Sequence, residues 1–298
     1  MPLRDLADVS EKRMQLALEE ARVAFKQHGD RGTHVEEAVR AFLRQVNPFS
    51  REAGFATFEK VRENGRVISM AVLIAVGVRS TGEREVVGVD VGPAEDHEFW
   101  LQFLRQLVSR GLSGVRLVIS DSHLGLKQAV AQVFVGSTWQ RCRVHFMRNA
   151  MATVPKVAQQ MVAATLRTVF APPDQASAHE TIERICRLFE KRYPQLVKVV
   201  QEAEVDVLAY FSFPVEHRRQ IWSTNSLERL NKEVSRRCDV VGIFPNRASL
   251  LRLTGAVLEE QNDEWAVGRR YFSTESMNKL YQPTNEEVVK TLLELESA

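Results

Sequence analysis

The order of hydrophobic periods along the chain limits the available folds more than any other feature. Residues 57–62, 67–78 and 85–91 alternate or run apolar as β-strands do, and an Asn64-Gly65 turn predicts a hairpin between the first two. Helical periods at 96–110 and 124–134 then alternate with short strand patterns at 115–120 and 138–142. This βββαβαβ order predicts a mixed sheet covered by helices.

Helical patterns flank these strands on both sides. We expect helices at 10–28 and 33–46, followed by a break in regular structure at 47–54. After the last strand the chain reads as helical from residue 144. The later predicted helical regions are 155–212 with a break at 171–173, then 225–238, 248–261 and 285–296.

Composition excludes several classes of protein. The chain has 298 residues, enough for about two domains, and its 44% hydrophobic content is too high for a disordered chain. The longest apolar run, 70–78, is too short to cross a membrane, and the N-terminus lacks the apolar core of a signal peptide. Three scattered cysteines, Cys142, Cys186 and Cys238, do not form a disulfide framework. These features predict a soluble protein of the reducing cytoplasm.

The net charge of +2 conceals an uneven distribution of charged residues. Between Asp121 and Asp174 there is no carboxylate, but there are six cations: Lys127, Arg141, Arg143, Arg148, Lys156 and Arg167. A second basic stretch covers 218–252 and includes Arg219, Arg229, Lys232, Arg236, Arg237 and Arg247. Such segments suit either a surface that faces a polyanion or a solvated helix face balanced from elsewhere.

Asp121 follows the apolar strand pattern that ends at Ser120. Sites in open α/β sheets form beyond the carboxyl ends of strands, where a carboxylate can bind a divalent cation. The alternative is that Asp121 caps the helix predicted from residue 124. Position alone leaves both interpretations open.

Glu228 lies at the start of the helix predicted from Asn225. Asn225 followed three residues later by Glu228 is a helix-capping signature, so the local pattern favours a cap over a metal ligand.

Cys142 and His145 raise the question of a zinc site. A structural zinc ion needs four protein ligands, and one Cys-x-x-His pair with a distant Cys238 supplies three. A buried thiol, with a histidine that contacts a phosphate or a carboxylate, is the alternative that we favour.

Two longer motifs follow one another in the chain. Segments 121–130 and 134–149 contain an Asp, a Gly four residues later, Gln-x-Cys-x-x-His and Arg-Asn, here Asp121, Gly125, Gln140, Cys142, His145, Arg148 and Asn149. The second motif is IWSTNSLERLNKE at 221–233 with VVGIFPN at 240–246. Both resemble the Mutator-family transposases of bacterial insertion sequences over about residues 56–275. One departure is Val135, where the family signature prefers Pro or Thr.

This resemblance implies a ribonuclease H-like fold with a DDE triad and an all-helical insertion. Asp121 would be the second aspartate and Glu228 the glutamate, with one Glu228 oxygen free for capping. The family's cofactor would be Mg²⁺ or Mn²⁺, since two such ions about 3.5–4 Å apart clamp the attacking and leaving oxygens of a phosphodiester. Water would cut the end of the element, and the freed 3′-hydroxyl would attack the target DNA.

The first aspartate of the family pattern is missing. The family's Asp-Ala-Thr-Tyr-x-Lys-Val-Arg aligns with residues 55–62, which places Phe55 at the aspartate position. Phenylalanine has no donor atom for a metal. Glu59 lies roughly 13 Å further along an extended strand, and Asp90 lies on a different strand, so neither is a convincing replacement. We therefore expect impaired catalysis.

The resemblance also implies how the chain is divided. We expect a helical segment at 1–54 that is unlike the family, a ribonuclease H-like core at 55–150, a helical insertion at 151–222, return helices at 223–275 and a tail at 276–298. Family members carry a helical end-binding region before the core, so a copy truncated or altered at its N-terminus is implied.

The predicted function is that of an insertion-sequence transposase, with a DNA-binding or assembly remnant as the alternative. An unrelated zinc module would require both motifs to be accidental. The expected partners are the element's ends, target DNA and a second copy or an intact transposase, in the bacterial cytoplasm at the nucleoid. The residues expected to face DNA phosphates are Arg141, Arg143, His145, Arg148, Arg229, Lys232, Arg236 and Arg237.

Overall fold

A computed structural model describes residues 48–53, 57–93 and 96–280 of the chain, with main-chain detail only for 48–53. The helices predicted at 10–28, 33–46 and 285–296 lie outside the described residues, and so does Phe55.

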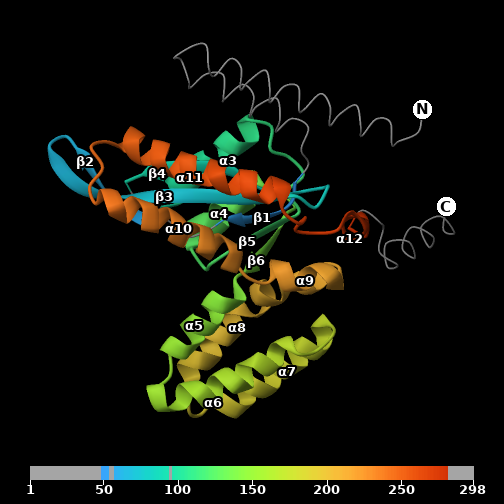
Figure 1. Ribbon diagram of the computed structural model, residues 1–298. Coiled ribbons are helices and arrows are strands. Elements are labelled where there is room, and N and C mark those ends of the chain that lie inside the picture. Colours follow the sequence, from blue (N-terminus) through green and yellow to red (C-terminus); the bar gives the residue numbers. More distant parts are fainter. Residues whose placement is uncertain (1–47, 54–56, 94–95, 281–298) are drawn as a thin grey trace, which may run out of the picture.

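A six-stranded mixed sheet forms the centre of the molecule (Figure 1). Its strands are β1 Pro48–Ala53, β2 Thr57–Glu63, β3 Arg66–Arg79, β4 Arg84–Gly92, β5 Leu117–Ser120 and β6 Thr138–Arg141. Along one edge of β3, β1 and β2 pair in succession, and β4 pairs along the other edge. Strand β5 is parallel to β1, and β6 is parallel to β5. The predicted mixed sheet is confirmed, and the first three predicted strands are β2, β3 and β4, which pair antiparallel.

The break predicted at 47–54 is wrong, because β1 occupies this stretch. Local signals suggested a loop, but backbone pairing with both β3 and β5 holds the segment extended. Proline is accepted because Pro48 is the first strand residue, a position where its missing N–H is tolerated.

The predicted hairpin between β2 and β3 is confirmed. Glu63 pairs with Arg66, and the two residues between them, Asn64 and Gly65, both have positive φ angles of 48° and 77°. Two successive left-handed residues match the twist of antiparallel strands, and asparagine and glycine reach this conformation at the lowest cost.

Helices cover both faces of the sheet. Strand β3 is buried on both sides, with Leu73 and Ala75 facing one helix pair and Val72 and Ile74 facing the other. The first pair is α3 His97–Ser109 and α4 Leu124–Val133, and the second is α10 Asn225–Val241 and α11 Arg247–Val267. Strand β5 and helix α10 are therefore both packed into this layered core.

A helical lobe connects β6 to α10 and packs below the sheet in Figure 1. It contains α5 Arg143–Ala152, α6 Lys156–Arg167, η1 Thr168–Phe170, α7 Gln175–Phe189, α8 Pro194–Leu208, η2 Ala209–Ser212 and α9 Val215–Ile221. Its apolar core is continuous with Leu117 and Ile119 of the sheet. The predicted helical stretch and its break at 171–173 are confirmed. Helix α12, Thr274–Asn278, follows α11.

Among the described residues, no helix is both long and apolar enough to cross a membrane.

Candidate catalytic site

Asp121 directly follows β5 and is half-buried. Its Oδ1 atom is buried without a hydrogen-bond partner. The predicted alternative, that Asp121 caps α4, is wrong, because His123 is the N-cap and its Nδ1 accepts from the Leu126 backbone N–H at 3.2 Å. The Asp121 carboxylate therefore does not cap helix α4.

The electrostatic surroundings of Asp121 act in opposite directions. Burial raises the pKa of its carboxyl, whereas a hydrogen bond from the His123 backbone and the nearby Arg141 charge lower it in part. Burial dominates, because it removes water from the charged form. A bound cation would compensate this carboxylate for its lost hydration.

Glu228 lies in the first turn of α10 but does not cap it, so the predicted capping role is wrong. The N-cap is Thr224, one residue earlier than the signature suggests, and α10 has no side-chain capping hydrogen bond. Glu228 thus sits a full turn into the helix, where its backbone N–H bonds to the Thr224 carbonyl at 2.9 Å. Its side chain points across to the helical lobe instead.

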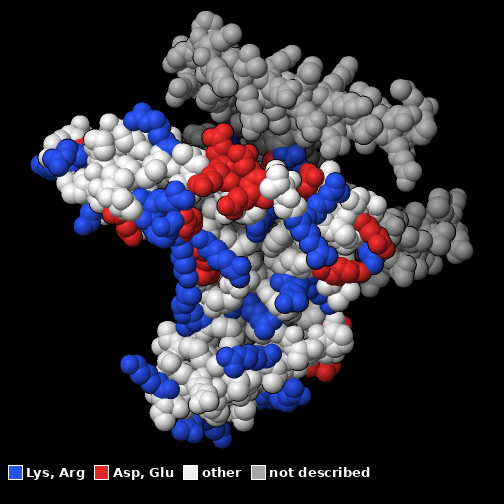
Figure 2. All heavy atoms as spheres, viewed as in Figure 1, with Lys and Arg blue, Asp and Glu red and all other residues white. Residues whose placement is uncertain are grey.

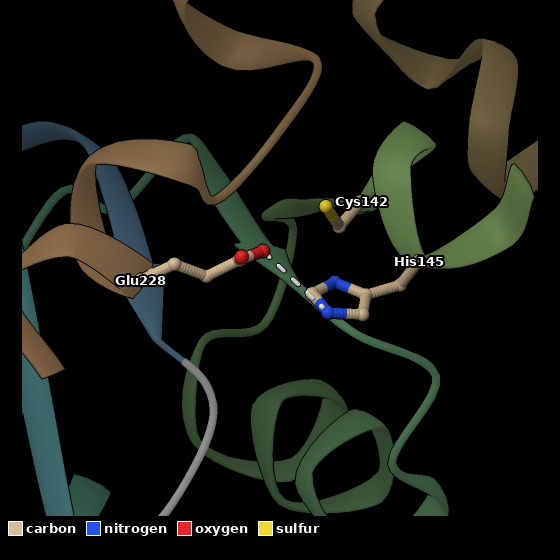
Figure 3. A group of neighbouring side chains, drawn as sticks. All are labelled: Cys142, His145 and Glu228. Carbon is tan, nitrogen blue, oxygen red and sulfur yellow. Dashed lines mark ion pairs between the residues drawn. The ribbon is translucent and has the colours of Figure 1, made fainter. Parts of the chain in front are cut away.

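Cys142, His145 and Glu228 meet where β6, α5 and α10 converge (Figure 3). His145 Nε2 lies 3.5 Å from Glu228 Oε1, and one potential ligand atom from each of the three residues falls within 4.8 Å of the others. The expected contact of His145 with a carboxylate is confirmed. Cys238 is absent from this group and packs in a different core cluster.

His145 is buried and electrically neutral at physiological pH. Burial, with smaller contributions from the charges of Arg148 and Arg141, lowers the pKa of its imidazole to about 4. A neutral imidazole can donate one hydrogen bond, so it suits the partner role toward Glu228 without adding a charge.

The basic residues that precede Glu228 occupy three different environments. The guanidinium of Arg143 lies 4.0 Å from the Phe170 ring centroid and 4.6 Å from that of Trp222. Arg141 is half-buried near Asp121, and Arg148 is exposed. Arg143 therefore joins the helical lobe to the return segment, whereas the charge of Arg141 acts on Asp121 and that of Arg148 acts on His145.

Helix α10 carries the remaining predicted cations. Arg229, Lys232 and Arg236 are exposed at spacings that share one helix face, whereas Arg237 is half-buried. Glu233 pairs with Arg236 at 2.6 Å and with Arg237 at 2.9 Å. Figure 2 shows basic side chains gathered where the sheet and the helical lobe meet, below a group of acidic ones. A DNA-facing role of these residues stays a prediction.

The two carboxylates considered as replacements for the missing aspartate have other partners. Glu59 is buried, its pKa is raised by burial, and it accepts from Ser235 Oγ at 3.1 Å. Asp90 pairs with Arg247 at 2.7 Å on β4, across β3 from β1. Each of these two carboxylates thus has a partner other than Asp121, Ser235 for Glu59 and Arg247 for Asp90.

Gln140 has a role that sequence reasoning did not assign. It is fully buried in β6, where Nε2 donates to the Val207 carbonyl at 3.0 Å and Oε1 accepts from the Tyr210 N–H at 2.7 Å. The available signal was a long polar side chain in a short strand pattern. Its partners could not be found because they lie 67 and 70 residues away.

Comparison with known proteins identifies the family. The fold and the site describe a mixed α/β protein with two separated carboxylates, one just beyond a strand and one in the first turn of a helix. Residues 32–268 match the family described as "Transposase, Mutator family". The chain therefore belongs to the Mutator family of transposases. The match reaches further toward the N-terminus than the resemblance from residue 56 that the motifs indicated.

Curated relatives are transposases of insertion sequences. The chain is 42% identical over 280 residues to the transposase of IS1081 from Mycobacterium tuberculosis, which covers 92% of this chain and 68% of that one. It is 42% identical to the transposase of IS406 from Burkholderia multivorans over 73% of this chain and 56% of the relative. The transposase of IS256 in transposon Tn4001 from Staphylococcus aureus is 38% identical over 72% and 55%.

One solved structure, titled "Drosophila P element transposase strand transfer complex", aligns at 13% identity over 86% of this chain and 74% of that chain. The TM-score of 0.27 is too low to relate the two folds.

Proposed function

We propose that this chain is the core of an insertion-sequence transposase, a DNA-acting protein in which Asp121 and Glu228 bind Mg²⁺ or Mn²⁺. One observation carries the proposal: Asp121 Oδ1 and Glu228 Oε1 are both buried and make no hydrogen bond, and the neighbour of Glu228 Oε1 is His145 Nε2 at 3.5 Å. Buried carboxylate oxygens without a partner are costly, and sites that keep them commonly bind an ion. The family membership and the insertion-sequence relatives support the same function.

The donor set fits a hard divalent cation. Mg²⁺ and Mn²⁺ prefer carboxylate oxygens, and one or two carboxylates with substrate phosphate oxygens complete a typical site. When bound, such an ion neutralises the charge that develops on the phosphodiester and activates the attacking oxygen. The chain's own residues hold the ion and orient the nucleic acid.

A ribonuclease H-like core is part of this proposal. The strand arrangement supports it. Strands β4, β2 and β1 pair antiparallel with β3, and β5 and β6 then follow β1 in parallel. In this arrangement Asp121 extends from the strand next to β1. Arg141 is close enough to Asp121 to affect its pKa, and Arg148 is close enough to affect that of His145, so both could bind the scissile phosphate.

The exposed face of α10 would carry the DNA backbone away from the site. Arg229 and Lys232 are single-turn neighbours on that face, beyond the first turn that holds Glu228. Removing a cation that binds one phosphate should reduce the salt dependence of DNA binding by about 0.9 in the log–log slope. We expect Arg229→Gln with Lys232→Gln to lower the slope by about two.

A matched control comes from the helical lobe, where Arg187 and Lys198 each face a glutamate one turn away on their own helix. Their double replacement by glutamine should leave the slope unchanged. An equal reduction of the slope in both double variants would show general charge attraction and contradict a DNA path along α10.

Phe55 favours a second candidate function, that of a DNA-binding or assembly remnant without catalysis. Residue 55 lies outside the described residues, between β1 and β2. A phenylalanine in place of a carboxylate removes one metal ligand, and such electrostatic stabilisation is commonly the largest catalytic contribution. We propose that this copy binds DNA and metal but cleaves poorly.

The metal site can be tested by titrating the full chain with Mn²⁺ and counting free ion by electron paramagnetic resonance. We expect Asp121→Asn and Glu228→Gln each to weaken Mn²⁺ binding at least tenfold, with Glu180→Gln on the exposed face of α7 as the control. Equal affinity of all four proteins would overturn the proposed site.

A further inference from the structure

Glu228 reaches the site only after the chain has passed through the whole helical lobe, from α5 to α9. Nothing in the local sequence of α10 fixes where its carboxylate ends up. In the structure, Gln140, Cys142, Arg143 and His145 contact the returning chain at successive points. We call residues 140–145 the docking segment.

The first contact fixes the end of α8. The amide of Gln140 donates to the Val207 carbonyl and accepts from the Tyr210 N–H, at 3.0 and 2.7 Å. Its Nε2 also donates to the Arg141 carbonyl at 2.7 Å. The Gln140 side chain is fully buried, so a partner group that lost its hydrogen bond to Gln140 could not bond to water instead. This penalty keeps the end of α8 in place.

The second contact fixes the residues just before α10. The backbone N–H of Arg143 donates to the Trp222 carbonyl at 2.9 Å. Cys142 Sγ accepts from both the backbone N–H and the hydroxyl of Thr224, at 3.4 and 3.3 Å. Because Thr224 is the N-cap, these bonds decide at which residue α10 begins.

The third contact reaches the carboxylate itself, where His145 Nε2 lies 3.5 Å from Glu228 Oε1. His145 is buried and Glu228 lies one turn after Thr224, so the ring meets a side chain whose backbone is already placed. Along the docking segment, the contacts thus reach first the end of α8, then the start of α10, and last the Glu228 carboxylate.

We propose that Gln140, Cys142 and His145 are positioning residues that hold Glu228 in reach of the ion bound by Asp121, an inference that rests on the proposed function. Gln140 and Cys142 set the path of the returning chain, and His145 sets the direction of the carboxylate. Neither Cys142 nor His145 touches the ion. This gives the Gln-x-Cys-x-x-His pattern a mechanical role rather than that of a zinc ligand set.

The contacts of Cys142 support this assignment. Its sulfur already accepts two hydrogen bonds from Thr224, the N-cap of α10. Cys142, His145 and Glu228 give three ligand atoms, one fewer than a closed structural zinc site contains. Outer-shell partners that orient a ligand typically change metal affinity 10- to 100-fold when removed.

The test uses Mn²⁺ affinity of the full chain, with conservative variants to separate position from packing. His145→Leu removes the polar contact with Glu228 and should weaken Mn²⁺ binding about tenfold, whereas His145→Gln keeps an amide near the Nε2 position and should stay within about threefold. His217→Leu is the control, since His217 of α9 is also buried but packs against the Phe272 ring, with the ring centroids 4.3 Å apart. The control should bind Mn²⁺ as the natural chain does.

Cys142 is tested in the same way. Cys142→Ala loses the acceptor for Thr224 and should weaken binding, and Cys142→Ser should restore most of it. Cys238→Ala is the control for removal of a buried thiol from α10. Weakening by both alanine variants alike would mean that loss of packing is sufficient, and would overturn the positioning role of Cys142.

Failure of this inference is distinguishable from failure of the proposed function. If Glu228→Gln weakens Mn²⁺ binding but His145→Leu does not, the site stands and the positioning role is refuted. If neither changes binding, the proposed site fails. The positioning role is then decided by metal-free crystal structures, in which an unmoved Glu228 carboxylate in His145→Leu refutes it.

Mass spectrometry of the native chain adds a final outcome. Stoichiometric zinc that is retained through purification and lost in His145→Leu would overturn the proposal in favour of a Cys-His-Glu metal site.

Discussion

Replacing Gln140 with methionine removes the hydrogen bonds that attach the helical lobe to the sheet while keeping the side chain's length. Gln140 is fully buried, and its amide serves the Tyr210 N–H and the Val207 carbonyl. Each buried backbone group left without a partner costs about 1–3 kcal/mol, and the apolar methionine recovers a part through its own burial. We expect Gln140→Met to lower the free energy of unfolding by about 2–4 kcal/mol.

Urea denaturation followed by circular dichroism measures this loss. Gln160→Met on the exposed side of α6 is the matched control and should change stability by no more than about 0.5 kcal/mol. A Gln140→Met variant as stable as the control would refute the reasoning, because it would mean that the two backbone groups find partners without the glutamine amide.

Four other substitutions have expected outcomes. Arg143→Lys should lower stability by about 1 kcal/mol in urea denaturation, because an ammonium cannot stack between two rings as a guanidinium does; full stability would contradict this. Burial lowers the pKa of His217, so the unfolded chain takes up the proton first and stability falls as the pH falls below about 6.5. The free energy of unfolding of His217→Phe should therefore fall less steeply between pH 7.5 and 5.5. Equal pH dependence of the variant and the natural chain would contradict this. Burial raises the pKa of Asp121, so without metal Asp121→Asn should melt at a higher temperature, increasingly so as the pH rises above about 4; a lower melting temperature would contradict this. Arg236→Ala with Arg237→Ala should weaken DNA binding and flatten its salt dependence, and an unchanged slope would exclude both side chains from the DNA path.

The parts of the fold that sequence patterns predicted are those decided by local chemistry. Asn64 and Gly65 readily adopt positive φ angles between paired strands, so the hairpin was predictable. Strand β1 was missed because its proline and polar residues carry no strand signal. It is extended only through its pairing with two distant strands, which no local pattern contains.

The candidate site was predictable only in part for the same reason. The strand pattern placed Asp121 at the end of β5, where it lies. The capping signature misplaced Glu228, because the start of α10 is fixed by Thr224 bonding to Cys142, 82 residues earlier in the chain. The two aromatic neighbours of Arg143, Phe170 and Trp222, could not be predicted because they come from distant segments. Contacts between distant segments decide what such residues do.

Nicking of supercoiled plasmid DNA in Mn²⁺ tests the central claim most directly, with the natural chain beside Phe55→Asp. The account predicts that Phe55→Asp nicks the plasmid while the natural chain is far slower. It also predicts that adding Asp121→Asn or Glu228→Gln to Phe55→Asp abolishes nicking, and that EDTA does the same. Nicking by Phe55→Asp that survives loss of Asp121 and Glu228, or equally fast nicking by the natural chain, would contradict the account.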